Sequence, residues 1–236
     1  MALAPLLSAA TMLLSLAFGA LVLARWRAAR KRHQLLWGAS LLLFALASGL
    51  ELLAALQGWG EAGYKLYFVA TATMVALMAS GTGHLVSRNL GGAFLAYLFI
   101  VSLWLSVFTL FAAADPARLA EANASGAVPT KVLGSIGFLH AMLDVPSALF
   151  LVVSPLLNWR ATRAAYTLLI AAGALVFTAV HTLASGAQTG VLALDSATLF
   201  GAGTLTGLLL MFAGYLRSRE TPQARREAAQ AVAASG

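Results

Sequence analysis

Long apolar runs recur along almost the whole chain, separated by mostly short polar or basic connections. Each run is long enough to cross a hydrocarbon core of about 30 Å as an α-helix, which requires about 20 residues. The pattern predicts an all-α, polytopic membrane protein with seven spans, at about residues 3–24, 34–57, 64–86, 92–113, 132–157, 164–186 and 195–216. Residues 1–216 therefore form a predicted seven-helix bundle, and the charged residues 217–236 form a predicted cytoplasmic tail.

The composition agrees with this pattern. Hydrophobic residues make up 61% of the chain and charged residues only 10%, whereas soluble domains average about 45–50% apolar and about 25% charged residues. Little sequence remains for a soluble domain. Cysteine is absent, which excludes disulfides, thiolate metal sites and cysteine nucleophiles.

The basic residues are distributed unequally between the two predicted membrane faces. Only Lys65, Arg118 and Lys131 lie on one face. The opposite face has twelve: Arg25, Arg27, Arg30, Lys31, Arg32, Arg88, Arg160, Arg163, Arg217, Arg219, Arg225 and Arg226. The positive-inside rule therefore places the C-terminus in the cytoplasm and the N-terminus outside. The net charge of +7 is thus a topology signal, and no nucleic-acid partner is expected.

Five ionisable residues fall inside predicted spans: Glu51, His84, His140, Asp144 and His181. Such groups are costly in hydrocarbon, so they normally face the bundle interior or a wet cavity. With a rise of about 1.5 Å per residue, Glu51, His140, His181 and Asp144 come to lie about 9, 12, 7 and 18 Å from the outer ends of their spans. These four share the outer half of the bundle. His84 lies near the cytoplasmic end and is predicted to have a separate, structural role.

The stretch HAMLDVPSALFLVVSP contains His140 and Asp144 at positions i and i+4, on one face of a helix. Pro146 follows and cannot donate to the carbonyl four residues earlier, which leaves a backbone acceptor beside this polar face. We therefore expect Glu51, His140, Asp144 and His181 to converge on one outward-facing pocket, formed by the second, fifth and sixth spans.

Three interpretations of these residues stay open. They can simply join helices by interhelical hydrogen bonds of about 1 kcal/mol each. They can form a site, open to the outside, for a ligand, a substrate or protons. They can also bind a metal or haem, for which His140, His181, Asp144 and Glu51 are the candidate ligands. No catalytic residue is assigned, and enzyme activity is left open.

Three further features indicate how the helices are anchored and packed. Gly203 and Gly207 have the GxxxG spacing of close helix packing. The connection ADPARLAEANASGAVPTK is read as a connector, although it is long enough to cover the outer mouth of the bundle. Tryptophans lie near predicted span ends, as in an interfacial aromatic belt: Trp26, Trp37, Trp59 and Trp159.

Two known seven-helix chemistries do not fit the residues present. Seven spans with an outside N-terminus resemble a microbial rhodopsin, but the retinal Schiff base needs a lysine in the last span. The lysines are Lys31, Lys65 and Lys131, so retinal is not expected. The alkaline ceramidases and adiponectin-receptor-like hydrolases have zinc sites that include an HxxxH pair, whereas His140 and Asp144 form HxxxD and the last span has no HxxxH.

The basic first loop with LLWGASLLLFALASGLELLAALQGWG, the stretch LHAMLDVPSALFLV and the closing LLLMFAGYL resemble bacterial seven-helix membrane proteins. More loosely, they resemble the seven-helix sensor regions of membrane histidine kinases. The resemblance implies a bacterial cytoplasmic-membrane protein with an outward-facing polar pocket and a separate signalling partner. The expected function is receptor-like binding or sensing of a small molecule or lipid. The alternatives are a small proton-coupled transporter and a metal- or haem-dependent intramembrane enzyme or electron carrier.

Overall fold

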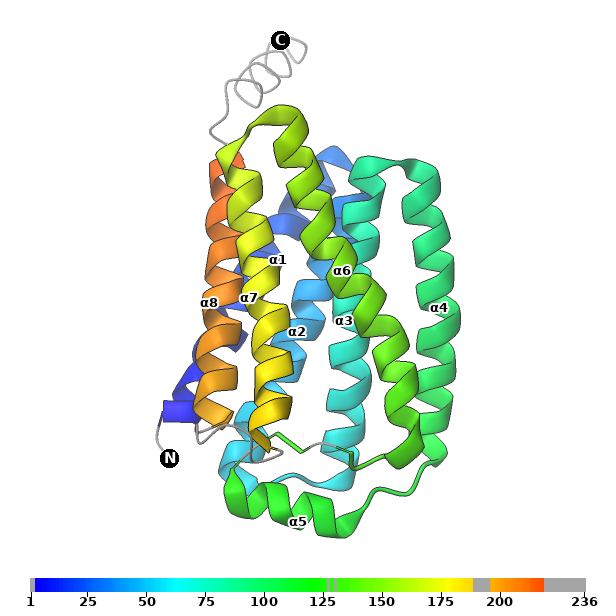
Figure 1. Cartoon of the computed structure of the whole chain (residues 1–236), viewed down its shortest axis with the longest axis vertical. Coiled ribbons are helices and arrows are strands. Elements are labelled where there is room, and N and C mark those ends of the chain that lie inside the picture. The colour runs from blue at the N-terminus through cyan, green and yellow to red at the C-terminus, as the bar shows by residue number, and fades with distance from the viewer. Residues whose placement is uncertain (1–2, 127, 130, 189–195, 219–236) are drawn as a thin grey trace.

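In a computed structural model the chain forms a bundle of long helices that run roughly side by side (Figure 1). The structure describes residues 3–126, 128–129, 131–188 and 196–218, without the side chains of 85–86, 135, 161–162, 181–188 and 196–197. Within these residues it is all-α, with eight α-helices and one 3₁₀ turn, η1 (Gly134–Ile136). The helices are α1 (Leu3–Ala29), α2 (Arg32–Gln57), α3 (Glu61–Val86), α4 (Arg88–Phe111), α5 (Pro116–Ser125), α6 (Gly137–Thr162), α7 (Ala165–Gln188) and α8 (Ser196–Ser218).

The long helices lie where the hydrophobic pattern predicts them. In the described part of the chain, α1, α2, α3, α4, α6 and α8 are long and apolar enough to cross a membrane, and α7 contributes the apolar stretch Ala165–Val180. The protein is therefore a multi-pass membrane protein. Boundaries differ by up to five residues, and among the helix starts the fifth span differs most: it was predicted to begin near residue 132, but α6 begins at Gly137. Gly134 has a φ of +54°. This left-handed backbone conformation does not fit a right-handed α-helix, so α6 begins after it. Residues 219–236 of the predicted tail lie outside the described residues.

Six of the long helices form a closed ring in the order α1, α2, α3, α6, α7 and α8, with α8 returning to contact α1. Helix α4 lies outside this ring against α3 and α6 (Figure 1). The ring is filled by a core cluster that includes Phe18, Leu41, Met74, Leu208 and Tyr215. Because these residues come from four helices, the core joins the first and last parts of the chain.

Glycines allow α7 and α8 to pack closely. A Cβ atom at Gly207 would lie 2.9 Å from the carbonyl oxygen of Gly173, and one at Gly203 would collide with Val180. Real side chains essentially never approach so closely, so the contact requires glycine at both positions. The prediction that Gly203 and Gly207 pack helices within one bundle is confirmed.

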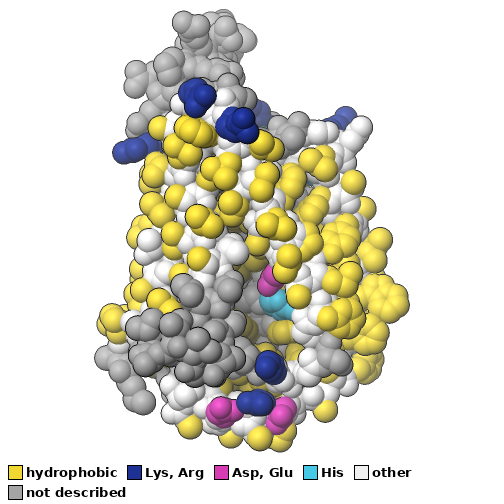
Figure 2. Space-filling view, viewed as in Figure 1, with side chains coloured by type: hydrophobic (Ala, Val, Ile, Leu, Met, Phe, Trp, Pro, Cys, Tyr) yellow, Lys and Arg dark blue, Asp and Glu magenta, His cyan; other side chains and the backbone are white. Residues whose placement is uncertain are grey.

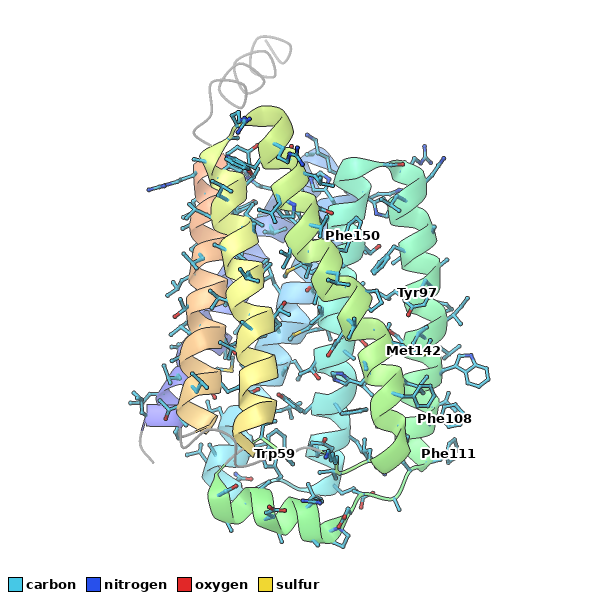
Figure 3. The ribbon with its side chains drawn as sticks, viewed as in Figure 1. Trp59, Tyr97, Phe108, Phe111, Met142 and Phe150 are labelled. Carbon is cyan, nitrogen blue, oxygen red and sulfur yellow. The ribbon has the colours of Figure 1, made fainter. Side chains whose placement is uncertain are left out.

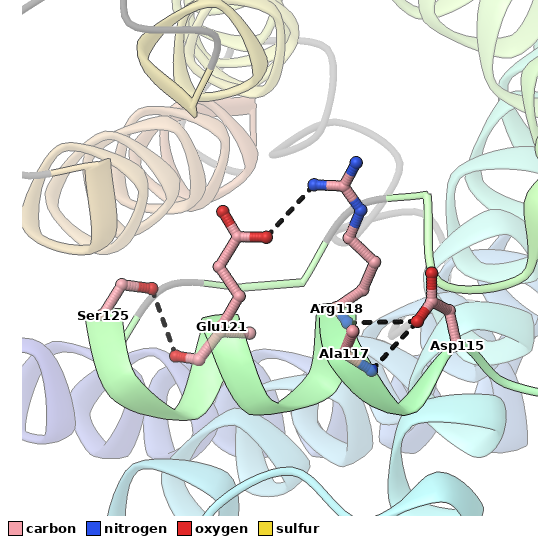
Figure 4. A network of polar contacts seen from close by, with 6 residues as sticks. Asp115, Ala117, Arg118, Glu121 and Ser125 are labelled. Carbon is pink, nitrogen blue, oxygen red and sulfur yellow. Dashed lines mark hydrogen bonds and ion pairs between the residues drawn. The ribbon is translucent and has the colours of Figure 1, made fainter.

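The connection after α4 forms a short helix, α5, that lies across one end of the bundle (Figure 1). Asp115 caps it, because one carboxylate oxygen accepts hydrogen bonds from the backbone N–H groups of Ala117 and Arg118, at 2.9 and 3.3 Å (Figure 4). Arg118 also pairs with Glu121 at 3.1 Å. Gly126, with a φ of +69°, ends the helix.

The inner face of α5 is buried. Leu119 packs into a cluster with Tyr64, Tyr67, Val132 and Leu133. The connection is therefore a cover over this end of the bundle as well as a connector, and its helix was not predicted.

The four tryptophans of the predicted interfacial belt differ in their contacts. Trp26 and Trp159 lie near helix ends, each with an arginine guanidinium 5.1 Å from the ring centroid. Trp37 donates a hydrogen bond to the carbonyl of Met78 in α3, at 3.2 Å. Trp59 packs edge-on against tyrosine rings of α3. Trp37 and Trp59 thus also join α3 to its neighbours, and the interfacial belt stays a prediction.

Candidate ligand site

The centre of the site is a contact between His140 and Asp144 on α6. Nδ1 of His140 lies 2.8 Å from Oδ2 of Asp144, across one helical turn. The two side chains are 21% and 35% exposed, respectively. The contact predicted from the i, i+4 spacing is therefore present, and it is open on one side.

Helix α3 contacts the other nitrogen of the same imidazole. Nε2 of His140 lies 3.1 Å from the hydroxyl oxygen of Thr71. The Thr71 hydroxyl also lies within hydrogen-bonding distance of the carbonyl oxygens of Tyr67 and Phe68, at 3.0 and 3.1 Å. The direction of the bond between Nε2 and Thr71 depends on the imidazole tautomer. Both ring nitrogens of His140 therefore have a polar partner, Asp144 on α6 and Thr71 on α3.

Asp144 retains one unused acceptor. Its Oδ1 atom is shielded from solvent and has no hydrogen-bond partner among the described residues. An unpaired carboxylate oxygen in a protein interior is costly unless a donor or a cation completes it. Because this oxygen is shielded, a group from outside the chain can complete it only after neighbouring side chains move.

The flank of the bundle is hollowed on the face where α6 and α7 lie. Figure 2 shows a histidine and an acidic side chain in this hollow, with apolar side chains on the described surface above it. This view agrees with the partial exposure of His140 and Asp144. The opening is directed sideways, toward the lipid that surrounds a membrane bundle.

Pro146 frees a backbone acceptor, but that acceptor does not serve the pair. The Tyr97 hydroxyl of α4 donates a hydrogen bond of 2.6 Å to the carbonyl of Met142 (Figure 3). This is the carbonyl that a residue other than proline at position 146 would bond within the helix. The expectation of a free backbone acceptor beside His140 and Asp144 is therefore wrong, because α4 occupies it.

Glu51 lies in a second opening, at the end of the bundle covered by α5. A cavity of about 140 Å³ is lined there by Ala4, Ser8, Glu51, Ala54, Ala55, Gly58, Trp59, Ala122, Asn123, Gly126, Val128, Phe200 and Gly201. The Ser8 hydroxyl is 3.5 Å from one Glu51 oxygen. No described basic side chain forms an ion pair with Glu51.

Tyr67 of α3 is near both acidic residues. Its hydroxyl interacts with the Glu51 carboxyl and is within electrostatic range of Asp144. Helix α3 packs against both α2 and α6. His140 and Asp144 are in contact on α6, Glu51 lies on α2, and the convergence of these residues with His181 on one pocket stays a prediction.

Sequence reasoning assigned the wall of the site to the second, fifth and sixth spans and missed α3. The missed residues are Tyr67 and Thr71. A signal was present, because Tyr64, Tyr67 and Thr71 are spaced three and four residues apart and form a hydroxyl-bearing stripe on one helix face. The backbone of His181 lies in α7, but its side chain is outside those described, and its place in the site stays a prediction.

His84 is separate from these residues, as predicted. Its Nδ1 lies 2.9 Å from the carbonyl oxygen of Ser80, and its ring lies against Gly91, where a Cβ atom would collide with it. His84 thus packs α3 against the start of α4.

No group of three or more His, Cys, Asp or Glu residues in the described part of the chain is arranged to hold a metal ion. Because the His181 side chain is outside that part, metal or haem ligation by His140, His181, Asp144 and Glu51 is still an open hypothesis. Comparison with known protein families, with curated proteins and with solved structures finds no match. Function must therefore be argued from the site.

Proposed function

We propose that the protein is a seven-span receptor-like protein of the bacterial cytoplasmic membrane, with its N-terminus outside and its C-terminus in the cytoplasm. It binds a small molecule or lipid through Glu51, His140, Asp144 and His181 in its outer half. The orientation is supported by the twelve basic residues on one predicted face and the three on the other.

The observation that carries the binding function is the exposed His140–Asp144 pair with its unused oxygen. A pair that only joined helices would be enclosed, with its acceptors satisfied by neighbouring helices. Here Asp144 is 35% exposed, and Oδ1 has no described partner. A ligand with a hydrogen-bond donor or a positive charge would complete this oxygen.

The position of the hollow favours a ligand that enters from the bilayer. Apolar side chains cover the described surface above it (Figure 2), so the hydrocarbon part of an amphipathic molecule can lie against the bundle while its polar group reaches Asp144. A separate signalling partner would then recognise the occupied state of the bundle.

The test is the substitution Asp144→Asn, which keeps the shape of the side chain and removes its charge. Wild-type protein purified in a mild detergent should retain a bound small molecule or lipid, detectable by native mass spectrometry. The variant should lose it while keeping its helical circular dichroism spectrum. Glu121→Gln is the matched control, because Glu121 lies on the exposed surface of α5. Equal occupancy in wild type and Asp144→Asn would contradict the proposal.

A small proton-coupled transporter is the second candidate. Two observations favour it: Tyr67 is within electrostatic range of both Glu51 and Asp144, and α4 lies outside a ring made of α1–α3 and α6–α8. The latter is the arrangement expected if two three-helix repeats were joined by a single helix. Substrate-dependent acidification of proteoliposomes, lost in Asp144→Asn, would select this candidate over a receptor. A visible absorption spectrum and a metal analysis of the purified protein would test the haem and metal alternatives.

A further inference from the structure

We propose that the cavity beside Glu51 holds a small methylated ammonium group, carried either by a free molecule or by a lipid headgroup. This inference deepens the proposed ligand-binding function, because it names the ligand chemistry of the Glu51 part of the site. It rests on the charge, the size and the lining of the cavity under α5.

The described lining of the cavity carries a negative side chain and no positive one. Glu51 is the only acidic or basic residue among the described lining residues, and no described lysine, arginine or histidine pairs with it. Its nearest polar contacts are hydroxyl groups, those of Ser8 at 3.5 Å and Tyr67. A carboxylate in this setting attracts a cation, because the protein supplies no counter-charge and the surroundings are poorly screened.

The size of the cavity limits the occupant to a small group. Its volume is about 140 Å³, and a protein cavity of about 150 Å³ accommodates a benzene molecule. Roughly half a dozen non-hydrogen atoms can therefore enter. Tetramethylammonium and the trimethylammonium end of choline are within this limit, whereas a drug-sized molecule, which needs at least about 300 Å³, is not.

The lining favours methyl groups over N–H donors. Small and apolar residues dominate it, including Ala4, Ala54, Ala55, Val128 and Phe200. A primary ammonium would need about three acceptors, whereas Glu51 and Ser8 are the only acidic or hydroxyl-bearing side chains among the described lining residues.

The Asn123 side chain of the lining already has partners. Asn123 bonds the backbone of Trp59 through both ends of its amide, accepting from the N–H and donating to the carbonyl. Trp59 also lines the cavity, and tryptophan is the aromatic residue that attracts cations most strongly. A methylated cation next to one carboxylate and one indole matches this set of residues.

Helix α5 forms one wall of the cavity. Ala122, Asn123 and Gly126 of this segment are part of the lining, and the two bonds between Asn123 and Trp59 hold α5 to the loop after α2. Small, strongly hydrated cations such as sodium are disfavoured in this cavity, because the single carboxylate cannot replace their water shell.

The experiment uses the full chain in nanodiscs of phosphatidylglycerol, which carries no ammonium group. Isothermal titration with tetramethylammonium chloride should show saturable binding, about tenfold tighter than that of methylammonium. Sodium chloride at equal ionic strength serves as the reference. Glu51→Gln should weaken tetramethylammonium binding by about tenfold or more. The matched control is Glu61→Gln, because Glu61 pairs with Lys65 at 2.7 Å and does not line the cavity.

A second variant keeps the test decisive if Glu51→Gln fails to fold. Ala54→Leu leaves the carboxylate in place and fills the cavity, so it should also abolish binding. Nanodiscs of phosphatidylcholine distinguish the two sources of the ammonium: a lipid headgroup would compete and weaken binding about fivefold or more, whereas a free amine would leave the affinity unchanged. Both results support ammonium recognition.

Absence of saturable tetramethylammonium binding to the folded wild type would overturn the inference, as would unchanged binding in Glu51→Gln or Ala54→Leu. Such a result would leave the proposed function standing if Asp144→Asn still released a bound molecule. If instead tetramethylammonium binding were intact but Asp144→Asn released no bound molecule, only the proposed role of the His140–Asp144 hollow would be contradicted.

Discussion

Replacing Tyr97 with phenylalanine is expected to destabilise the bundle by about 1 to 1.7 kcal/mol, although the change removes a single oxygen atom. The Tyr97 hydroxyl donates a 2.6 Å hydrogen bond to the Met142 carbonyl. Within α6 that carbonyl has no partner four residues later, because position 146 is proline. Loss of the hydroxyl therefore leaves an unpaired backbone acceptor, and the cost falls near the upper end of measured interhelical hydrogen bonds in membranes.

The reasoning can be separated from a general packing effect by a double-mutant cycle. In a Pro146→Ala background, the new N–H of residue 146 can bond to the Met142 carbonyl within the helix. Tyr97→Phe should then cost less than about half of its value in the wild-type background. The free energy of unfolding would be measured for all four proteins by reversible denaturation in detergent, followed by circular dichroism.

Tyr215→Phe is the matched control for Tyr97→Phe. The Tyr215 hydroxyl is buried and has no partner in the described part of the structure, so its removal should be neutral or slightly stabilising. An equal loss of stability from Tyr97→Phe with and without Pro146 would refute the reasoning. No loss in either background would refute it equally.

Three further predictions concern packing, topology and pigment formation. Gly203→Ala should destabilise the contact between α7 and α8 by about 1 to 3 kcal/mol in the same unfolding assay, because its Cβ would collide with Val180. Gly92→Ala, where no atom lies within 4 Å of the added Cβ, should not destabilise. A reporter active only outside the cytoplasm should be silent when fused after Gly236 and active when inserted at Ala124; the reverse pattern would invalidate the orientation. Added retinal should form no pigment, since the last span lacks a lysine; a red-shifted, hydroxylamine-sensitive band would show otherwise.

The long helices were predictable because each membrane span requires a long run of apolar residues that can be recognised in the sequence. A run of about 20 apolar residues identifies a span without any knowledge of its neighbours. Helix α5 lacks such a run, since only Leu119 and Ala122 of its residues are buried. Its signals are those of a soluble helix: Asp115 as the N-cap, Pro116 in the first turn and Gly126 after the end. A search for long apolar runs does not register them.

The candidate site was predictable only where it is local. The contact between His140 and Asp144 follows from the helical repeat alone. The contacts with Thr71 and Tyr67 depend on α3 lying between α2 and α6. Depth along a span does not determine which way a side chain faces around the bundle, so the shared outer half could not predict that Glu51 lines the cavity under α5 while His140 contacts Thr71 of α3.

The contact between α1 and α8 has a consequence for biogenesis. The Phe18 ring of α1 lies 4.7 Å from that of Phe212 and 5.2 Å from that of Tyr215, both in α8. During synthesis, α1 enters the membrane first. Its core-facing side stays uncovered until α8, the last span, is inserted. Until α8 leaves the ribosome, that side of Phe18 must be shielded by lipid, by an insertase or by another nascent helix, and translation that stops before α8 would produce an open ring for membrane proteases to remove.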